Sequence, residues 1–285
     1  MPELTLAHLG PTGTYSEMAA IAYAESLAQQ GQASQLQLHR TIQGTLQAVV
    51  RGDADQAIVP VENSIEGQVP ASLDTLWQSE GLQVQKTLVL PIRHALISTA
   101  VDLGHIRIVR SHPQALAQCR DWMAVHIPTA DQQPSNSTSE ALAHLRENPN
   151  WAAIASERAA HLYDLPILAQ PINDQPDNCT RFWVVGPQPS PGGSLTSLAF
   201  SLPANEPGAL MRALEIFARR QLNMSRIESR PTKRSLGEYL FFVDLEANAR
   251  GPEVQDALGE LATVTEDLRL LGSYDLLDLS QSEPD

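Results

Sequence analysis

The segment 187–194, Pro-Gln-Pro-Ser-Pro-Gly-Gly-Ser, constrains the fold of this 285-residue chain more than any other stretch. Three prolines and two glycines in eight residues interrupt helices and strands alike, so the segment predicts a linker. The parts on either side, 1–186 and 195–285, both have lengths typical of a domain. We therefore expect two domains joined at 187–194.

Short apolar runs alternate with amphipathic helical patterns in the first part. The stretch 16–30, for example, places Met18, Ile21 and Ala22 on one helical face. Alternating strands and helices predict an α/β fold with a mostly parallel sheet. About eight runs read as strands, which one sheet or two lobes could accommodate. These runs are 4–9, 36–39, 57–61, 82–90, 94–98, 106–109, 152–155 and 182–185.

The second part has a different pattern. Apolar residues alternate over 198–202 and 239–245, which predicts strands, and 210–217 has the spacing of a helix. With further strands near 224–229 and 268–276 and a helix near 253–261, the order is βαββαβ. This order is that of a ferredoxin-like unit.

The charge balance and the motifs that are missing exclude several function classes. With 19 basic and 33 acidic residues the net charge is −14, which argues against nucleic acid and anionic membranes as partners. Two cysteines exclude a disulfide framework, and no apolar run reaches the length of a membrane span. The first basic residue is Arg40, so we expect no secretory leader and a cytoplasmic location. Neither a glycine-rich phosphate motif nor a histidine pair with metal-ligand spacing occurs, and we expect no cofactor and no metal.

Three segments have the S/T-x-x-E/Q pattern of a helix start: Thr14 with Glu17, Ser111 with Gln114, and Ser137 with Glu140. Helix N-termini at the carboxyl ends of parallel strands share one edge of a sheet and attract anions. The pattern can serve stability alone, or it can contribute to a cleft that binds a carboxylate. The residues leave both possibilities open at each junction.

Two polar clusters, 60–64 and 178–182, flank apolar strands. Asparagines there fit turns, and Arg181 fits a surface ion pair, but both clusters also fit a small-anion site. At these clusters the sequence resembles prephenate dehydratases. The motifs of that family occur in order as Leu9–Ser16, Pro60–Ser64 with Gly67, Ser111–Leu116 with Gln118 and Cys119, Ser137-Thr138, and Asn178–Phe182. The second part resembles an ACT domain that binds phenylalanine, with Pro207–Leu210, Ile227–Pro231 and Tyr239–Asp244.

The resemblance implies a catalytic region of two α/β lobes, similar to a periplasmic binding protein. We expect the chain to cross between the lobes near 78–90 and 165–174. The implied reaction converts prephenate to phenylpyruvate with loss of CO2 and water, without a cofactor. Many family members also carry a chorismate mutase domain, which we do not expect here because the chain begins on a strand by Leu4.

By motif match, Thr180 is the expected proton donor to the leaving hydroxyl, either directly or as a relay. Arg181 could pair with a substrate carboxylate or tie the lobe together through Glu62. Tyr15 and Phe182 match packing positions. The residues expected to orient the substrate are Asn63, Ser64, Ser111, Gln118, Ser137 and Thr138.

The ACT resemblance implies feedback inhibition by phenylalanine bound between two subunits, hence a homodimer or homotetramer. Phenylalanine and the substrate would then antagonise each other's binding. The expected effector-binding residues are Asn205, Gly208, Ala209, Leu210, Glu228, Ser229 and Arg230.

Two alternatives remain. Arogenate dehydratase acts on the aminated substrate and gives phenylalanine directly. A non-catalytic amino-acid sensor would share the lobes, although intact Asn63 and Thr180-Arg181-Phe182 argue against it.

Overall fold

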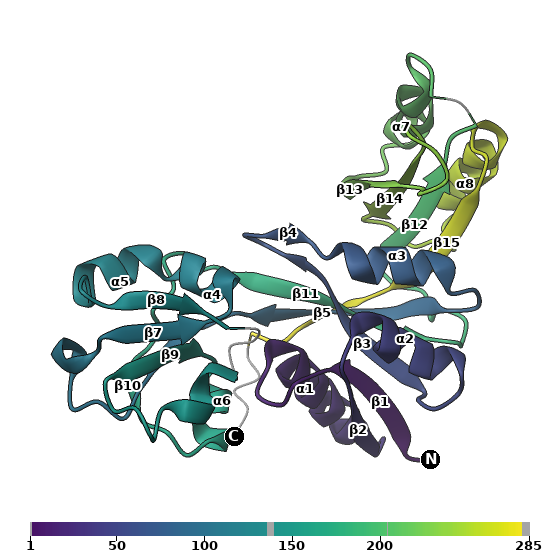
Figure 1. Ribbon diagram of the computed structural model, residues 1–285. Coiled ribbons are helices and arrows are strands. Elements are labelled where there is room, and N and C mark those ends of the chain that lie inside the picture. The colour runs from purple at the N-terminus through teal and green to yellow at the C-terminus, as the bar shows by residue number, and fades with distance from the viewer. Residues whose placement is uncertain (1, 136–139, 204, 281–285) are drawn as a thin grey trace.

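The computed structural model describes residues 2–135, 140–203 and 205–280. Two α/β lobes lie side by side, and a third unit stands against the first lobe (Figure 1). Three separate sheets underlie these units. The expected α/β class is thus confirmed, and the eight runs of the first part divide into two lobes.

The first lobe is built on a mixed sheet with the order β16-β5-β11-β3-β1-β2, and β4 pairs with β3. β1, β2 and β3 are parallel, whereas β11 is antiparallel to both β3 and β5. Its elements are β1 (Leu4–Leu9), α1 (Tyr15–Gln29), β2 (Ser34–His39), α2 (Ile42–Val50), β3 (Gln56–Asn63), β4 (Gly67–Gln68), α3 (Pro70–Gln78), β5 (Gln83–Pro91), β11 (Cys179–Gly186) and β16 (Leu276–Asp278).

The second lobe has a five-stranded sheet with the order β10-β6-β9-β7-β8. Apolar strands at its centre pack against short helices, with Val109, Ile154 and Leu116 in one buried cluster. Its strands are β6 (Ala95–Ile97), β7 (Ile108–Ser111), β8 (Asp131–Pro134), β9 (Trp151–Ala155) and β10 (Ile167–Ala169), and its helices are η1 (Leu103–His105), α4 (Pro113–Gln118), α5 (Arg120–His126), η2 (Glu140–His144) and α6 (Glu157–Leu162).

The chain passes between the lobes at positions shifted from those expected. Residues 83–91, expected near the first crossing, form β5 inside the first sheet, so the chain crosses at 92–94. The apolar residues of this stretch are those of a buried strand, because Leu88 and Leu90 pack into the core of the first lobe. The return crossing occupies 170–178, between β10 and β11, and overlaps the expected 165–174.

The third unit has the predicted ferredoxin-like order. β12 (Leu195–Ser201), α7 (Ala209–Arg219), β13 (Met224–Pro231), β14 (Tyr239–Leu245), α8 (Pro252–Val264) and β15 (Leu268–Tyr274) follow one another as βαββαβ. Its antiparallel sheet has the order β13-β14-β12-β15, so β13 is an edge strand. We call this unit the ACT-like unit.

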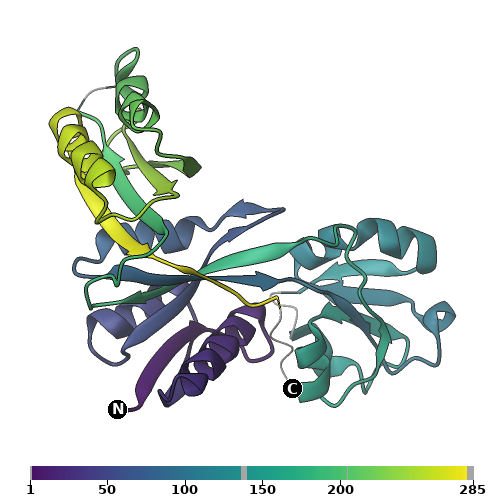
Figure 2. The same ribbon diagram turned by 180° about the vertical axis from the view of Figure 1, so that it is seen from behind.

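The last strand leaves the ACT-like unit. After β15 the chain forms β16, which pairs in parallel with β5 of the first lobe (Figure 2). Residues 276–278, expected within the second part, therefore belong to the sheet of the first lobe. The proline-rich segment itself is fixed to both sides, since Ser190 N donates to Gln83 Oε1 (2.7 Å) and Gly192 N donates to Ser273 O (2.9 Å).

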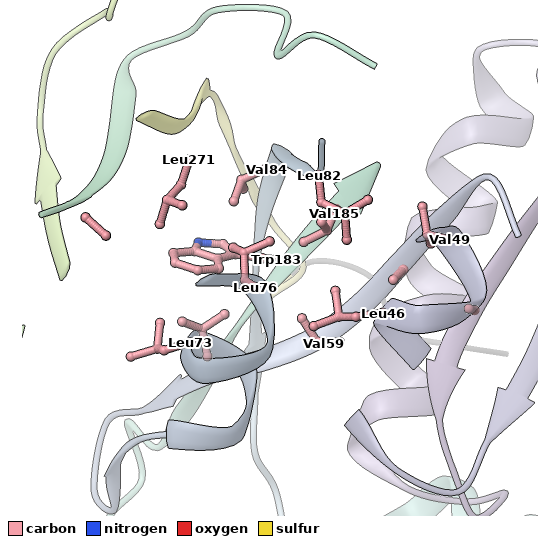
Figure 3. Close-up of a cluster of buried hydrophobic side chains, with 14 of the residues drawn as sticks. Leu46, Val49, Val59, Leu73, Leu76, Leu82, Val84, Trp183, Val185 and Leu271 are labelled. Carbon is pink, nitrogen blue, oxygen red and sulfur yellow. The ribbon is translucent and has the colours of Figure 1, made fainter. Parts of the chain in front are cut away.

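One hydrophobic cluster spans the first lobe and the ACT-like unit. It surrounds Trp183 of β11 and includes Leu73 and Leu76 of α3 together with Leu271 of β15 (Figure 3). β15 approaches β5 so closely at Gly272 that a Cβ there would lie 2.3 Å from Val84 O. Burial of shared apolar surface thus holds the ACT-like unit against the sheet that carries β11.

Helix α1 begins with the predicted cap. The Glu17 backbone N–H donates to Thr14 Oγ1 (3.4 Å), and the Gly13 N–H donates to the Glu17 carboxylate (2.7 Å). Within the described residues, no helix is long and apolar enough to cross a membrane. Both Cys119 and Cys179 are free thiols.

Candidate functional site

Thr180 lies opposite Asn63 across the antiparallel strands β11 and β3. The Asn63 Nδ2 donates to Thr180 Oγ1 at 3.0 Å and to the Cys179 carbonyl at 3.1 Å. Strand pairing therefore brings together residues that are more than a hundred positions apart in the sequence. Both side chains are partly exposed.

The orientation of the Asn63 amide is fixed by the backbone. The N–H groups of Ile65 and Glu66 both donate to Asn63 Oδ1 at 3.0 Å, so this atom must be the oxygen. The Asn63 nitrogen consequently faces Thr180 and donates to it. Because Thr180 Oγ1 accepts this bond, its hydroxyl hydrogen remains for another acceptor.

Asn178 and Ser64 complete the group on the first lobe. Asn63 Nδ2 also faces Asn178 Oδ1 at 2.8 Å, so its two hydrogens are shared among three acceptors, and Ser64 Oγ accepts from the Cys179 N–H (3.0 Å). Ser64 Oγ lies 3.4 Å from Asn178 Oδ1. Asn178 is 2% exposed, so its amide is held in place within the second crossing.

The group continues into the second lobe. Asn178 Nδ2 donates to Gln118 Oε1 (3.0 Å), and the same oxygen lies 3.0 Å from His94 Nε2. Gln118 Nε2 is 3.4 Å from the Glu66 carboxylate. On the far side, His94 Nδ1 lies 3.0 Å from the Tyr15 hydroxyl. The site thus joins both lobes and both crossings.

Burial holds His94 and Tyr15 of this group uncharged. Burial lowers the pKa of His94, although its hydrogen bond to Gln118 works in the opposite direction. Burial also raises the pKa of Tyr15 well above its usual value and that of Cys119 likewise. The hydrogen-bonding groups are therefore amides, hydroxyls and a neutral imidazole, which suit orientation and hydrogen bonding of a polar ligand.

Ser111 does not join the group. Its hydroxyl is fully buried and donates to the Ile154 carbonyl of β9 at 2.6 Å. The cap that we expected from Ser111 is formed by His112, whose Nδ1 accepts from the Gln114 N–H (3.3 Å). Ser111 is the last residue of β7, so the N-cap position of α4 falls on the next residue. Ser137 and Thr138 lie outside the described residues.

Arg181 points to the opposite face of the sheet from Thr180, because successive side chains of a strand point to opposite faces. Its Nη1 lies 3.2 Å from Asp244 of the ACT-like unit and 3.7 Å from Glu62. Of the two expected roles, the ion pair with Glu62 is present in these contacts. The sequence could not indicate Asp244, because that contact depends on how the ACT-like unit packs.

Asp244 is the centre of a buried ion-pair cluster beside the site. Arg226 donates to both its oxygens, at 2.6 and 3.0 Å, and to Gln68 Oε1 of β4 at 2.8 Å. The Arg226 guanidinium also lies over the Trp183 ring, 5.2 Å from its centroid, which is within the range of a cation–π contact. These contacts link the ACT-like unit to the strands that carry Asn63 and Thr180.

The ACT-like unit contains a cavity of about 700 Å³ at the start of α7. This volume is in the range of small-molecule sites. Gly208 adopts φ = +81°, which favours glycine, and so turns the chain into α7. The expected effector-binding residues that line the cavity are Asn205, Gly208, Ala209 and Leu210.

The other expected effector-binding residues, Glu228, Ser229 and Arg230, are on the edge strand β13 and do not line this cavity. Arg230 instead makes two 3.1 Å bonds to Asp74 of α3, which Lys233 also contacts at 2.7 Å. Burial alone would raise the pKa of Asp74, but the bonds from these two cations outweigh it and lower the pKa. The structure therefore divides the expected effector site into two separate parts.

Sequence reasoning missed three members of the site. The sequence places Asn178 where it fits a turn, and it places Tyr15 at a position that matches packing residues. His94 interrupts the apolar stretch 87–101. A histidine inside an apolar run was therefore the available signal. In the parts of the chain that the structure describes, no three His, Cys, Asp or Glu side chains gather where a metal ion could bind.

Comparison with known proteins shows which families the chain is similar to. The family model described as prephenate dehydratase matches residues 6–190, and the ACT domain model matches 196–263. A prephenate dehydratase from Lactococcus lactis subsp. cremoris is 37% identical over 286 residues, covering 98% of this chain and all of the relative.

Solved structures show the same architecture. A prephenate dehydratase from Arthrobacter aurescens in complex with L-Phe superposes with a TM-score of 0.84 at 37% identity, covering 95% of this chain and 90% of the other. A protein described as GqqA, a novel type of quorum quenching acylase, has a TM-score of 0.82 at 30% identity, covering 96% and 98%. One architecture therefore occurs with two described activities, and the site residues must carry the functional argument.

Proposed function

The chain belongs to the prephenate dehydratase family, and we propose that its catalytic centre is the hydrogen-bonded group around Thr180. The enzyme converts prephenate to phenylpyruvate, and its C-terminal part is an ACT regulatory domain. The assignment of the centre rests on the hydrogen bond between Asn63 and Thr180, in which Asn63 must donate and Thr180 must accept.

The reaction needs a hydrogen-bond donor at the leaving hydroxyl. The bond between the ring and its carboxylate breaks, and its electron pair enters the ring. The carbon–oxygen bond on the opposite side then breaks, and the hydroxide leaves as water with a proton that comes from solvent. Thr180 donates a hydrogen bond to the leaving oxygen or relays this proton and regains one in turn, because Asn63 already occupies Thr180 Oγ1 as a donor. A donor aimed at developing charge contributes about 10²–10³-fold to the rate.

The amide groups orient the substrate. Gln118 Oε1 is engaged by Asn178 and His94, and one Nε2 hydrogen faces the Glu66 carboxylate, which leaves the other Nε2 hydrogen for a ligand. Ser64 supports the Asn178 amide, and Ser111 supports the strand that leads into α4, where Gln118 lies. Ser137 and Thr138 belong to the same proposed set by motif match.

The ACT domain binds L-phenylalanine in the cavity beside Gly208. Support comes from the cavity volume, and the relative from Arthrobacter aurescens is itself described in complex with L-Phe. Glu228 and Ser229 lie on the free edge of β13, where a second subunit could bring them to the cavity of the first. We therefore propose at least a homodimer, with a homotetramer as the alternative. The two free cysteines support a reducing, cytoplasmic location.

The direct test is to incubate the purified chain with prephenate and measure the absorbance of phenylpyruvate in alkali. We expect product formation that millimolar L-phenylalanine inhibits. A parallel incubation with arogenate, analysed for phenylalanine, distinguishes the aminated substrate. Absence of product from both would overturn the proposed function and favour an amino-acid sensor. Light scattering during size-exclusion chromatography measures the oligomeric state.

A further inference from the structure

In the site, the backbone fixes which atom of Asn63 accepts, and each amide then fixes donor and acceptor in the next. The Ile65 and Glu66 N–H groups fix Asn63 Oδ1 as an acceptor, so Asn63 Nδ2 donates to Asn178 Oδ1. The Asn178 nitrogen must then face Gln118, which makes the facing Gln118 atom an oxygen. No amide in this series can be rotated without opposing two donors or two acceptors.

His94 lies at the end of this series. Its Nε2 is 3.0 Å from Gln118 Oε1, an atom that can only accept. His94 must therefore carry a hydrogen on Nε2. In the neutral ring, Nδ1 then carries no hydrogen, and the Tyr15 hydroxyl has one hydrogen for two acceptors, His94 Nδ1 at 3.0 Å and the Arg93 carbonyl at 2.7 Å.

The surroundings hold the imidazole in this position. His94 is 3% exposed, and its ring packs edge-on against Tyr15 with 5.6 Å between centroids. Its backbone N–H donates to Asn173 Oδ1 (2.6 Å), and Asn173 Nδ2 donates to the Ile92 carbonyl (3.0 Å). Two residues of the first crossing are thereby bonded to one residue of the second, so a displacement between the lobes acts on His94.

We propose that His94 is a positioning residue for the dehydratase reaction. Its Nε2–H holds the Gln118 amide with the oxygen toward Asn178 and the nitrogen toward the substrate. His94 acts through Gln118 and does not itself touch the substrate. The inference rests on the proposed roles of Thr180 and Gln118.

The test compares His94→Gln with His94→Leu in the full-length enzyme. Glutamine retains an N–H donor for Gln118, whereas leucine fills similar space without one. We expect His94→Leu to lower kcat about 100-fold, as a small misplacement of a catalytic group does, with little change in KM. His94→Gln should recover most of the loss. Thermal unfolding of both variants reports any general damage to the fold.

Two results would overturn the inference: a wild-type kcat in His94→Leu, or equal kcat losses in the two variants with parallel losses of thermal stability. The second result would assign His94 to packing alone. Thr180→Ala is assayed alongside. Wild-type turnover in that variant would reject the proposed catalytic centre, whereas a large loss there with normal activity of His94→Leu rejects only the role of His94.

A spectroscopic measurement covers the case in which His94→Leu does not fold. Imidazole nitrogen shifts of the ¹⁵N-labelled wild-type enzyme distinguish the two neutral tautomers, and the signal missing in His94→Gln identifies His94. We expect the Nε2–H form in the wild type. A wild-type ring protonated only on Nδ1 would contradict the proposal.

Discussion

Asn63 Nδ2 donates to Thr180 Oγ1 across 3.0 Å, and the two residues are direct partners on neighbouring antiparallel strands. The pairing makes Thr180 an acceptor toward the protein and a donor toward the substrate. Its hydroxyl needs no altered pKa for this role, because the polarity comes from the backbone N–H groups that orient Asn63.

The first prediction concerns the Thr180 hydroxyl. Thr180→Ala and Thr180→Val should each lower kcat about 10²–10³-fold, since both remove the donor aimed at the leaving oxygen. Thr180→Ser should retain much of the activity because it keeps the hydroxyl. Steady-state assays with prephenate measure the effect. Near wild-type turnover in Thr180→Ala would remove Thr180 from the mechanism.

The second prediction reverses the polarity of the pair. Asn63→Asp places an oxygen opposite Thr180 Oγ1, so the hydroxyl should donate to the new carboxylate instead of the substrate. We expect a loss of kcat similar to that of Thr180→Ala, about 10²-fold or more. The double variant Asn63→Asp/Thr180→Ala should lose little more than either single variant, because both remove the same hydrogen bond. Multiplicative losses would show that the two residues act separately.

Much of this site was predictable from the sequence because its residues border strands. Asn63 ends one apolar run and Thr180 begins another, and strand pairing brings such borders together. The βαββαβ order of the ACT domain was equally readable, since its helical and strand periods differ clearly.

Other features depend on packing between distant parts of the chain. Arg181 contacts Asp244 because the ACT domain covers that face of the sheet. β16 is only three residues long, and its place beside β5 follows from the position of β15, not from any local preference. The Ser111 hydroxyl could bond either a helix N-terminus or a sheet carbonyl, and local sequence does not distinguish them.

The third prediction concerns the buried Asp244. Asp244→Asn should destabilise the enzyme by about 3–5 kcal/mol, because it leaves the buried Arg226 guanidinium without its counter-charge. Urea unfolding measures the change. Asp164→Asn is the matched control, since Asp164 forms its ion pair with Arg146 at the surface and should matter little. Equal effects of the two substitutions would contradict the importance of burial.

The fourth prediction concerns pH. The bonds from Arg230 and Lys233 outweigh burial and lower the pKa of Asp74 in the folded enzyme. Its contribution to stability is therefore complete above the unfolded pKa, about 3.9, and is lost as the pH falls through the lower folded value. Urea unfolding should show that Asp74→Asn is less stable than wild type at pH 7, with a difference that shrinks below about pH 4.

Exposed Asp131 provides the control for this measurement. The difference between Asp131→Asn and wild type should stay small at every pH, because Asp131 lies at the surface on β8, away from the ACT domain. A gap between wild type and Asp74→Asn that widens toward acid would contradict the assigned direction.

The last prediction tests the effector cavity. Gly208→Ala places a side chain at φ = +81° beside the cavity, at a conformational cost of about 1–2 kcal/mol. We expect weaker binding of L-phenylalanine by calorimetry and weaker inhibition, with kcat unchanged when phenylalanine is absent. Gly52→Ala is the matched control, because Gly52 has a similar φ of +77° with no atom within 4 Å of an added Cβ. If both substitutions weaken inhibition equally, the cause is backbone strain and not the cavity.

Because linkage is reciprocal, prephenate should weaken the binding of phenylalanine to the wild-type enzyme by the same factor by which phenylalanine weakens the binding of prephenate.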